Sequence, residues 1–220
     1  MNVELILKFL KDLARHNNRD WFEAHKDRYL QAKQGFEEVV EKILAELVKF
    51  DSRLDGLEPR KLPFRIYRDV RFSKDKRPYK VNMGAGFSPN GRLVQEPGYY
   101  LHLEPGNKSF VAGGMYQPDS TRLAAIRQEI DYNPGPLRKI FASRSFRKYF
   151  DDFDDWDRVK TAPKGYPKDH PDIDWLKNRS FTLSFALSDR EVTDRRFVKT
   201  VAGICKAIKP VNDYLLEAIS

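Results

Sequence analysis

Residues 98–116 read GYYLHLEPGNKSFVAGGMY. Within this stretch, residues 98–104 and 109–116 have the two-residue period of β-strands, and the PGN tripeptide at 105–107 favours a turn. A connection this short joins strands that are antiparallel neighbours. The stretch therefore predicts two adjoining strands of an antiparallel meander.

Further strand patterns flank this meander on both sides. Upstream, NMGAGFS at 82–88 and FRIY at 64–67 alternate in the same way, and FTLSFALS at 181–188 is the clearest strand pattern in the chain. The last stretch places phenylalanine and leucine on one face and serine, threonine and alanine on the other, so its apolar face must be covered. We expect about five strands.

Helical spacing of apolar residues dominates both ends of the chain. The predicted helices cover the first turns up to Leu13, residues 20–50 with a bend at Gly35, residues 119–132, residues 134–150, and a C-terminal helix from about 191 that Pro210 kinks or ends. A loop is expected over 157–174. The pattern predicts an α+β fold: a single domain over residues 1–220 with a largely antiparallel sheet packed against the N-terminal and C-terminal helices.

The composition restricts the function classes. The formal net charge of +8 favours anionic partners. The only cysteine, Cys205, excludes a disulfide framework and a multi-cysteine metal site, and it fits a reducing compartment. No apolar run approaches the ~18–20 residues of a membrane span, so we expect a cytoplasmic protein without a membrane partner.

Positive charge is concentrated in RIYRDVRFSKDKRPYK at 65–80, which contains seven lysines and arginines and only two aspartates. Like charges at ~7 Å repel by about 0.6 kcal/mol each even in water. Two interpretations follow. One is an anion site lined by Arg65, Arg71 and Lys80, because arginine grips phosphate or carboxylate with two hydrogen bonds. The other is a lattice of internal ion pairs that fixes the loop 69–80.

Strand alternation over 64–71 would direct Arg68 toward the core side, and the nearest carboxylate in sequence is Asp69, which could pair with it across a bulge. The ligand-binding residues expected from the segment and the polar strand face beside it are Arg65, Arg68, Arg71, Lys76, Tyr79, Lys80 and Tyr100.

The same segment, together with WFEAHKDRY at 21–29, GYYLHLEP at 98–105, the pair Gly113-Gly114 and VKTAPKGYPKDHP at 159–171, resembles an uncharacterised family of bacterial and fungal proteins, domain of unknown function 2461. The resemblance spans nearly the whole chain and implies no established activity. The residues that it carries over are Arg65, Arg68, Asp69, Arg71, Phe72, Asp75, Lys76, Pro78, Tyr79 and Lys80. Lys74 and Arg77 fall on its variable positions.

Candidate proton-transfer groups are His102 and Glu104 on the polar face of the strand 98–104, and His170 in the loop 157–174. His102 and Glu104 form an H-x-E pattern, but the P-C-x-x-C partner of zinc deaminases is missing, and we expect neither a metal nor a cofactor.

Three function classes stay open. The first is a binding module for a nucleotide or nucleic acid, the second an enzyme acting on a phosphorylated small molecule, and the third a structural or interaction protein whose charges pair internally. The sequence does not indicate an oligomeric state.

Overall fold

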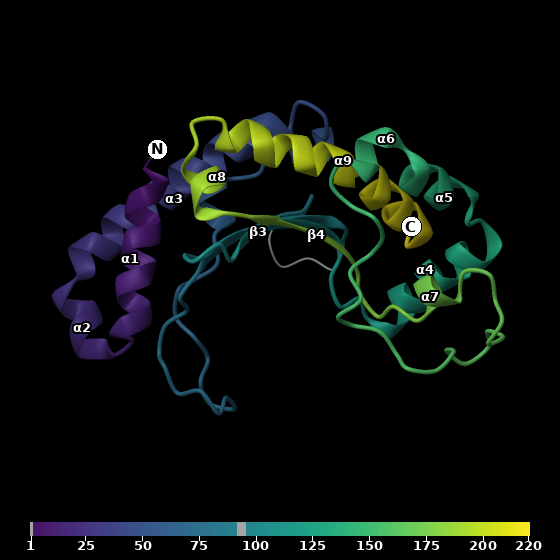
Figure 1. Cartoon of the computed structure of the whole chain (residues 1–220), viewed down its shortest axis with the longest axis horizontal. Helices are drawn as coiled ribbons and strands as arrows, with labels where there is room; N and C mark the ends of the chain where they lie inside the picture. The colour runs from purple at the N-terminus through teal and green to yellow at the C-terminus, as the bar shows by residue number, and fades with distance from the viewer. Residues whose placement is uncertain (1, 92–95) are drawn as a thin grey trace. The chain divides into compact units, whose positions relative to one another are not determined.

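The computed structural model describes residues 2–91 and 96–220 and has the predicted α+β fold (Figure 1). Its antiparallel sheet has four strands in the order β1-β2-β3-β4, so the expectation of about five is slightly high. The strands are β1 Met83–Phe87, β2 Gly98–Leu103, β3 Ser109–Met115 and β4 Phe181–Leu187. The short turn between β2 and β3 joins neighbouring strands, as the meander pattern predicts.

Helices occupy much of the remaining chain. They are α1 Val3–Arg15, α2 Arg19–Ala24, α3 Lys26–Leu47, α4 Ser120–Tyr132, α5 Gly135–Ala142, α6 Arg144–Arg147, α7 Ile173–Leu176, α8 Asp189–Thr193 and α9 Phe197–Ala218. Two short 3-10 helices, Ser52–Leu54 and Pro59–Lys61, lead from α3 toward β1. No helix in the described part of the chain is long and apolar enough to cross a membrane.

The helix predicted over 20–50 is two helices that meet at His25. Asn18 caps the first, because its side chain accepts a hydrogen bond from Trp21 N at 2.9 Å. His25 leaves helical geometry, with φ −119° and ψ 25°, and its ring nitrogen Nδ1 binds Trp21 O at 2.8 Å. The apolar stripe continues across this break, which is why the sequence period alone does not show it.

The patterns near the C-terminus are also subdivided. Residues 134–150 form α5 and α6, separated at Ser143, whose side chain caps α6. The C-terminal pattern forms α8 and α9, and α9 continues through Pro210 to Ala218. Ile208 and Val211 on either side of the proline are fully buried, so tertiary packing supports the helix where its backbone lacks a donor.

Residues 64–67 do not form the predicted fifth strand. Only isolated bridges occur here, Pro63 with Ala85 and Tyr67 with Tyr79. Tyr67 pairs with the returning half of its own segment, since Lys80 N donates to Ile66 O at 2.8 Å. Residues 65–80, called the arm below, therefore fold back on themselves and extend from the strands as a separate loop (Figure 1).

The chain divides into two compact units. Described residues of the first lie within Met1–Leu93, Tyr100–Val111 and Ala186–Ala202, and those of the second within Val94–Tyr99, Ala112–Phe185 and Gly203–Ser220. The first contains α1, α2, α3, α8, β1 and the arm, and α3 contacts β1. The second contains α4 to α7. The single domain over 1–220 stays a prediction.

Helices from both ends of the chain pack against strands, as expected. In the second unit, Ile208 of α9 lies so close to Gly113 of β3 that a Cβ on Gly113 would be 2.6 Å from it. The Asn212 side chain of α9 also donates to Gly98 O of β2 at 3.1 Å. The buried faces of β2 and β4 carry most of the apolar residues that alternation assigns to them, namely Tyr99, Leu101, Leu103, Phe181, Leu183 and Leu187. Phe185, assigned to the same face of β4, is only half-buried.

Candidate functional site

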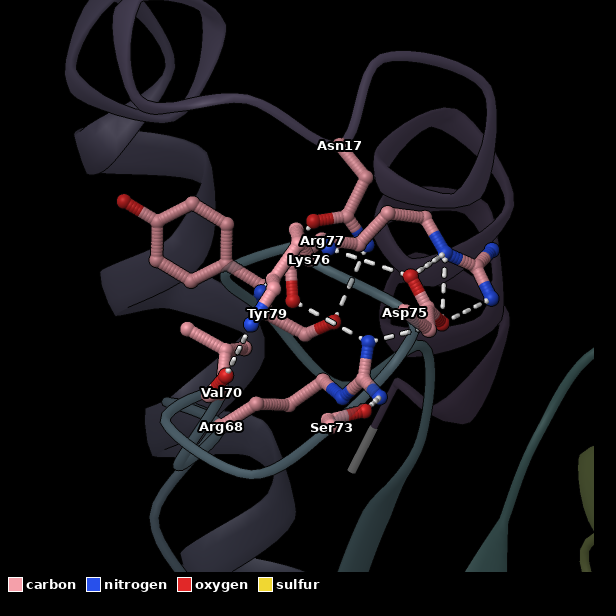
Figure 2. Close-up of polar contacts among 8 residues, drawn as sticks. All are labelled: Asn17, Arg68, Val70, Ser73, Asp75, Lys76, Arg77 and Tyr79. Carbon is pink, nitrogen blue, oxygen red and sulfur yellow. Dashed lines mark hydrogen bonds and ion pairs between the residues drawn. The ribbon is translucent and has the colours of Figure 1, made fainter.

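The base of the arm is held by Asn17, which lies between α1 and α2. The Asn17 side chain donates to Tyr79 O at 3.0 Å and accepts from Tyr79 N at 3.1 Å (Figure 2). It thus supplies the pair of hydrogen bonds that a neighbouring strand would supply. The Tyr79 ring is 4% exposed and stacks on Phe22 with centroids 4.0 Å apart. Tyr79 therefore anchors the arm, and its ring does not face solvent.

Arg68 cross-links the interior of the arm. Its guanidinium forms an ion pair with Asp75 at 2.8 Å and donates to Arg77 O at 3.1 Å and Ser73 Oγ at 3.4 Å (Figure 2). The predicted partner, Asp69, is wrong. The chain reversal brings Asp75 to Arg68, which a straight strand with a bulge could not do.

The two aspartates of the arm also pair with arginines two residues further on. Arg71 binds Asp69 at 2.6 Å and Arg77 binds Asp75 at 2.7 Å. These hydrogen bonds are the main reason that the pKa of each carboxyl group lies below its usual range. All four side chains are partly or largely exposed, so the pairs order the arm more than they stabilise the protein.

Lys76 is engaged as well, because its Nζ donates to Val70 O at 3.0 Å (Figure 2). Four of the seven cations, Arg68, Arg71, Lys76 and Arg77, thus have partners inside the arm. The lattice interpretation describes this part of the segment.

Three cations of the arm behave differently. Within residues 2–91 and 96–220, the side chains of Arg65, Lys74 and Lys80 form no hydrogen bond or ion pair. Lys74 is exposed, whereas Lys80 is half-buried. Burial first, and then the positive charge of Arg65, lower the pKa of Lys80. Arg65 and Lys80 are therefore a pair of like charges without a hydrogen-bonded carboxylate, although the charge of Arg65 also acts on Asp69.

The polar face of β2 and the residue that follows this strand carry a hydrogen-bonded series of three titratable side chains. Tyr100 Oη lies 3.1 Å from His102 Nδ1, and His102 Nε2 lies 3.1 Å from Glu104 Oε2. The His102 ring stacks on Phe110 with centroids 4.5 Å apart. Burial lowers the pKa of His102, the bond to Glu104 opposes that effect, and the charge of Lys80 adds to it.

Phe64 connects the base of the arm to this polar face. Lys80 Nζ lies 5.7 Å from the centroid of the Phe64 ring, and the rings of Phe64 and Tyr100 meet edge to face at 6.1 Å. The structure therefore brings Lys80, Tyr100 and His102 together in the first unit, with Arg65 beside Lys80. Arg71 and Lys76, predicted for the same site, bind partners within the arm instead.

His170 belongs to the second unit and has its own partners. Its Nε2 lies 3.0 Å from Asp131 Oδ1, and its Nδ1 accepts from Asp172 N at 3.0 Å. No group of three or more His, Cys, Asp or Glu among the described residues is placed to hold a metal ion.

The aspartate-rich run at 151–157 also finds partners in the second unit. Asp154 accepts from Thr182 and Ser184, both at 2.8 Å, and Asp157 pairs with Arg179 at 2.5 Å. These carboxylates are therefore engaged by residues of their own unit.

A hollow of about 260 Å³ in the first unit is lined by Leu5, Lys8, Phe9, Asp12, Arg28 and Gln31. Two of the three charged side chains that line it bind each other, with Arg28 and Asp12 at 2.6 Å. The hollow thus offers fewer unpaired groups than the base of the arm.

Sequence reasoning did not identify Asn17, Phe64 or Phe110 as parts of this site. Asn17 contacts a residue 62 positions away, so no local sequence pattern indicates this contact. Phe64 and Phe110 each follow the alternation of their segment, and that alternation does not reveal which polar residue they contact.

Comparison with known proteins gives one result. The family model described as conserved hypothetical protein (DUF2461) matches residues 5–214, a range that includes the arm and β2. No curated protein and no solved structure matches the chain.

Proposed function

The chain belongs to the conserved hypothetical protein family DUF2461, and from that premise we propose that it binds a phosphate-bearing anion at Arg65 and Lys80, beside the polar face of β2. The family description names no activity, so the support for this site comes from these residues alone.

One observation carries the proposal: Lys80 is half-buried next to a second cation and pairs with no carboxylate of the described chain. Withdrawing a cation from water costs free energy unless an opposite charge compensates. A bound anion would supply that charge and would also relieve the repulsion between Lys80 and Arg65. The two aspartates of the arm form ion pairs with Arg68, Arg71 and Arg77. We therefore expect the negative charge that compensates Lys80 to come from a ligand.

The surrounding groups favour phosphate over a simple halide. Arginine offers a planar fork of donors and lysine offers a point charge, which together suit an oxyanion. The Tyr100 ring contacts Phe64, whose ring centroid lies 5.7 Å from Lys80 Nζ, so aromatic side chains border Lys80. A nucleotide and a nucleic acid share this phosphate chemistry, so the experiment must separate them.

Titration calorimetry at low salt tests the proposal with three probes: inorganic phosphate, AMP and a single-stranded 12-mer. We expect K80M and R65M each to weaken phosphate and AMP binding by about tenfold or more, since a hydrogen bond to a charged group contributes ~1.5–3 kcal/mol. K74M is the matched control, because it removes an exposed cation from the same arm. Equal affinity of all three variants and the parent protein, or no binding to the parent, would refute the site.

Thermal unfolding gives an independent test. The folded-state pKa of Lys80 lies below that of the unfolded chain, so the folded protein holds this proton less tightly. The charged lysine therefore lowers stability below that pKa, and the lost stability returns as the pH rises toward the unfolded value. At pH 7 in phosphate-free buffer, K80M should raise the melting temperature while K74M leaves it unchanged. A lower melting temperature for K80M would indicate an internal partner for Lys80.

The same titrations can also show that the protein binds nucleic acid. Phe72 near the tip of the arm is 95% exposed and has Arg71 5.8 Å from its ring centroid, an arrangement suited to stacking on a base. A 12-mer that binds much more tightly than AMP, with affinity that falls steeply with salt, would extend the ligand along the arm. Equal affinity for AMP and the 12-mer would indicate that the protein binds a single phosphate group, next to Arg65 and Lys80.

Catalysis on a phosphorylated small molecule is a further candidate, favoured by the hydrogen-bonded chain from Tyr100 to Glu104. A cytoplasmic location is part of the proposal and is supported by the single cysteine, which is buried.

A further inference from the structure

Tyr100, His102 and Glu104 occupy alternate positions from β2 onward, so their side chains point to one face. The two contacts in this series are each 3.1 Å long and share the imidazole. A carboxylate accepts hydrogen bonds, so Nε2 of His102 carries a proton toward Glu104 and Nδ1 is left to accept from the Tyr100 hydroxyl. A histidine oriented by a carboxylate and bonded to a hydroxyl is the arrangement that activates hydroxyl groups in enzymes.

The surroundings hold the phenol in place. A Cβ on Gly84 of β1 would lie 2.3 Å from Tyr100 Oη, so the missing side chain leaves the space that the hydroxyl occupies. The Tyr100 ring also packs on Phe110 with centroids 5.7 Å apart. These contacts fix the phenol against His102, as a proton-transfer group requires.

Burial and the nearby charges keep the imidazole of His102 unprotonated near neutral pH. Glu104 favours the imidazolium, whereas Lys80 and burial oppose it, and the net effect is a pKa below the ordinary value. Lys108 lies 3.6 Å from the other oxygen of Glu104. Near pH 7 His102 is therefore neutral, with Nδ1 free to act as a base toward the phenol.

We propose that Tyr100, His102 and Glu104 form a proton relay in which the Tyr100 hydroxyl is the acid–base group that meets a substrate. In the base direction, a substrate hydroxyl transfers its proton to the Tyr100 oxygen while the phenol proton moves to His102 Nδ1. The imidazolium stays paired with Glu104, and the negative charge on the substrate oxygen lies toward Lys80 and Arg65. The reverse transfer restores every proton. The phosphorylated nature of the substrate rests on the proposed function, but the relay does not.

Acetylation by N-acetylimidazole tests the relay in the intact protein, because the phenol must lose its proton as it attacks the acetyl group and imidazole leaves. Peptide mass spectrometry gives the rate at each tyrosine between pH 5.5 and 8. Tyr132, which is 89% exposed, is the internal reference. At pH 7 we expect Tyr100 to react about 100-fold faster than Tyr132, the lower end of the usual effect of a general base.

The pH profile separates a relay from a merely structural contact. A phenol without a neighbouring base reacts through its phenolate, so its rate falls about tenfold for each unit by which the pH is lowered below a pKa near 10. The rate at Tyr100 should instead stay constant as the pH is lowered through 7, and should decrease only where His102 becomes protonated, at a pH below the ordinary pKa of imidazole. H102Q should give Tyr100 the profile of Tyr132, and E104Q should slow Tyr100 at pH 7 by about tenfold.

Each possible outcome either supports or refutes the relay. A Tyr100 rate that follows Tyr132, or that H102Q leaves unchanged, refutes the relay. An unmodified Tyr100 also refutes it, because a hydroxyl closed to a small reagent could not meet a substrate. Phosphate at 10 mM should protect Tyr100 in the parent protein but not in R65M/K80M. Fast acetylation without protection would leave the relay standing and remove phosphate from the site.

Discussion

Gly114 shows how one residue decides the packing of two strands. The Gly113-Gly114 pair lies within the strand predicted over 109–116, and the structure places both glycines inside β3. A Cβ on Gly114 would lie 2.0 Å from Phe181 O of β4, and Gly114 has φ +107°. Close packing therefore accounts for the pair.

G114A should cost about 3 kcal/mol, combining a backbone clash of ~1–3 kcal/mol with a left-handed penalty of ~1–2 kcal/mol. G165A is the matched control, because Gly165 also has positive φ, at +96°, but has nothing within 4 Å of its Cβ position. We expect G165A to cost only about 1 kcal/mol in urea denaturation. Equal losses for the two variants would show that the contact with Phe181 does not matter.

At the scale of the element, the arm combines the two interpretations that its sequence left open. Its tip follows the lattice interpretation, with Asp69 and Asp75 each bound to arginine. Its base is compatible with the other, because Arg65 and Lys80 have no hydrogen bond or ion pair to a carboxylate among the residues that the structure describes. The reversal at the tip separates these parts, because it directs Arg71 and Lys76 to partners within the arm.

The attachment of the arm depends on the amide of Asn17. N17A leaves Tyr79 N and Tyr79 O without their partners, so we expect a loss of about 1–3 kcal/mol and faster hydrogen exchange at the Tyr79 amide. N18A is the control, since Asn18 caps α2 and its loss should cost ~1 kcal/mol. Unchanged exchange at Tyr79 in N17A, or faster exchange in N18A, would contradict this role for Asn17.

At the scale of the whole molecule, α9 starts in the first compact unit and ends in the second, and β2, β3 and β4 also run through both. Elements shared in this way predict that the two units unfold together. This bears on the expectation of a single domain, and the tryptophans allow a test, because Trp21 belongs to the first unit and Trp156 and Trp175 to the second.

I208A removes a fully buried side chain from the second unit and should cost about 2–5 kcal/mol. If unfolding is cooperative, Trp21 fluorescence in a W156F/W175F background and Trp175 fluorescence in W21F/W156F should report the same lowered midpoint. K206A, an exposed change in the same helix, should leave both midpoints in place. A shift seen only by Trp175 would establish two domains.

The sequence by itself determined most of the strands and helices and the faces that they bury, although residues 64–67 form no strand and several predicted helices are each divided in two. Residues 98–104 illustrate this, because side-chain alternation is a local property of an extended backbone. Local charge was equally readable, since the excess of cations at 65–80 depends only on composition. His102 and Glu104 could likewise be assigned to one polar face, because two-residue spacing fixes the face.

Tertiary structure alone decided the partners. Asn17 meets Tyr79, Arg68 meets Asp75 rather than Asp69, and Phe64 joins Lys80 to Tyr100. The physical reason is that a period reports only the direction of a side chain from its own backbone. Which groups then meet depends on where the chain reverses and which segments pack together, so the unpaired charge of Lys80 emerges only after the arm has folded back.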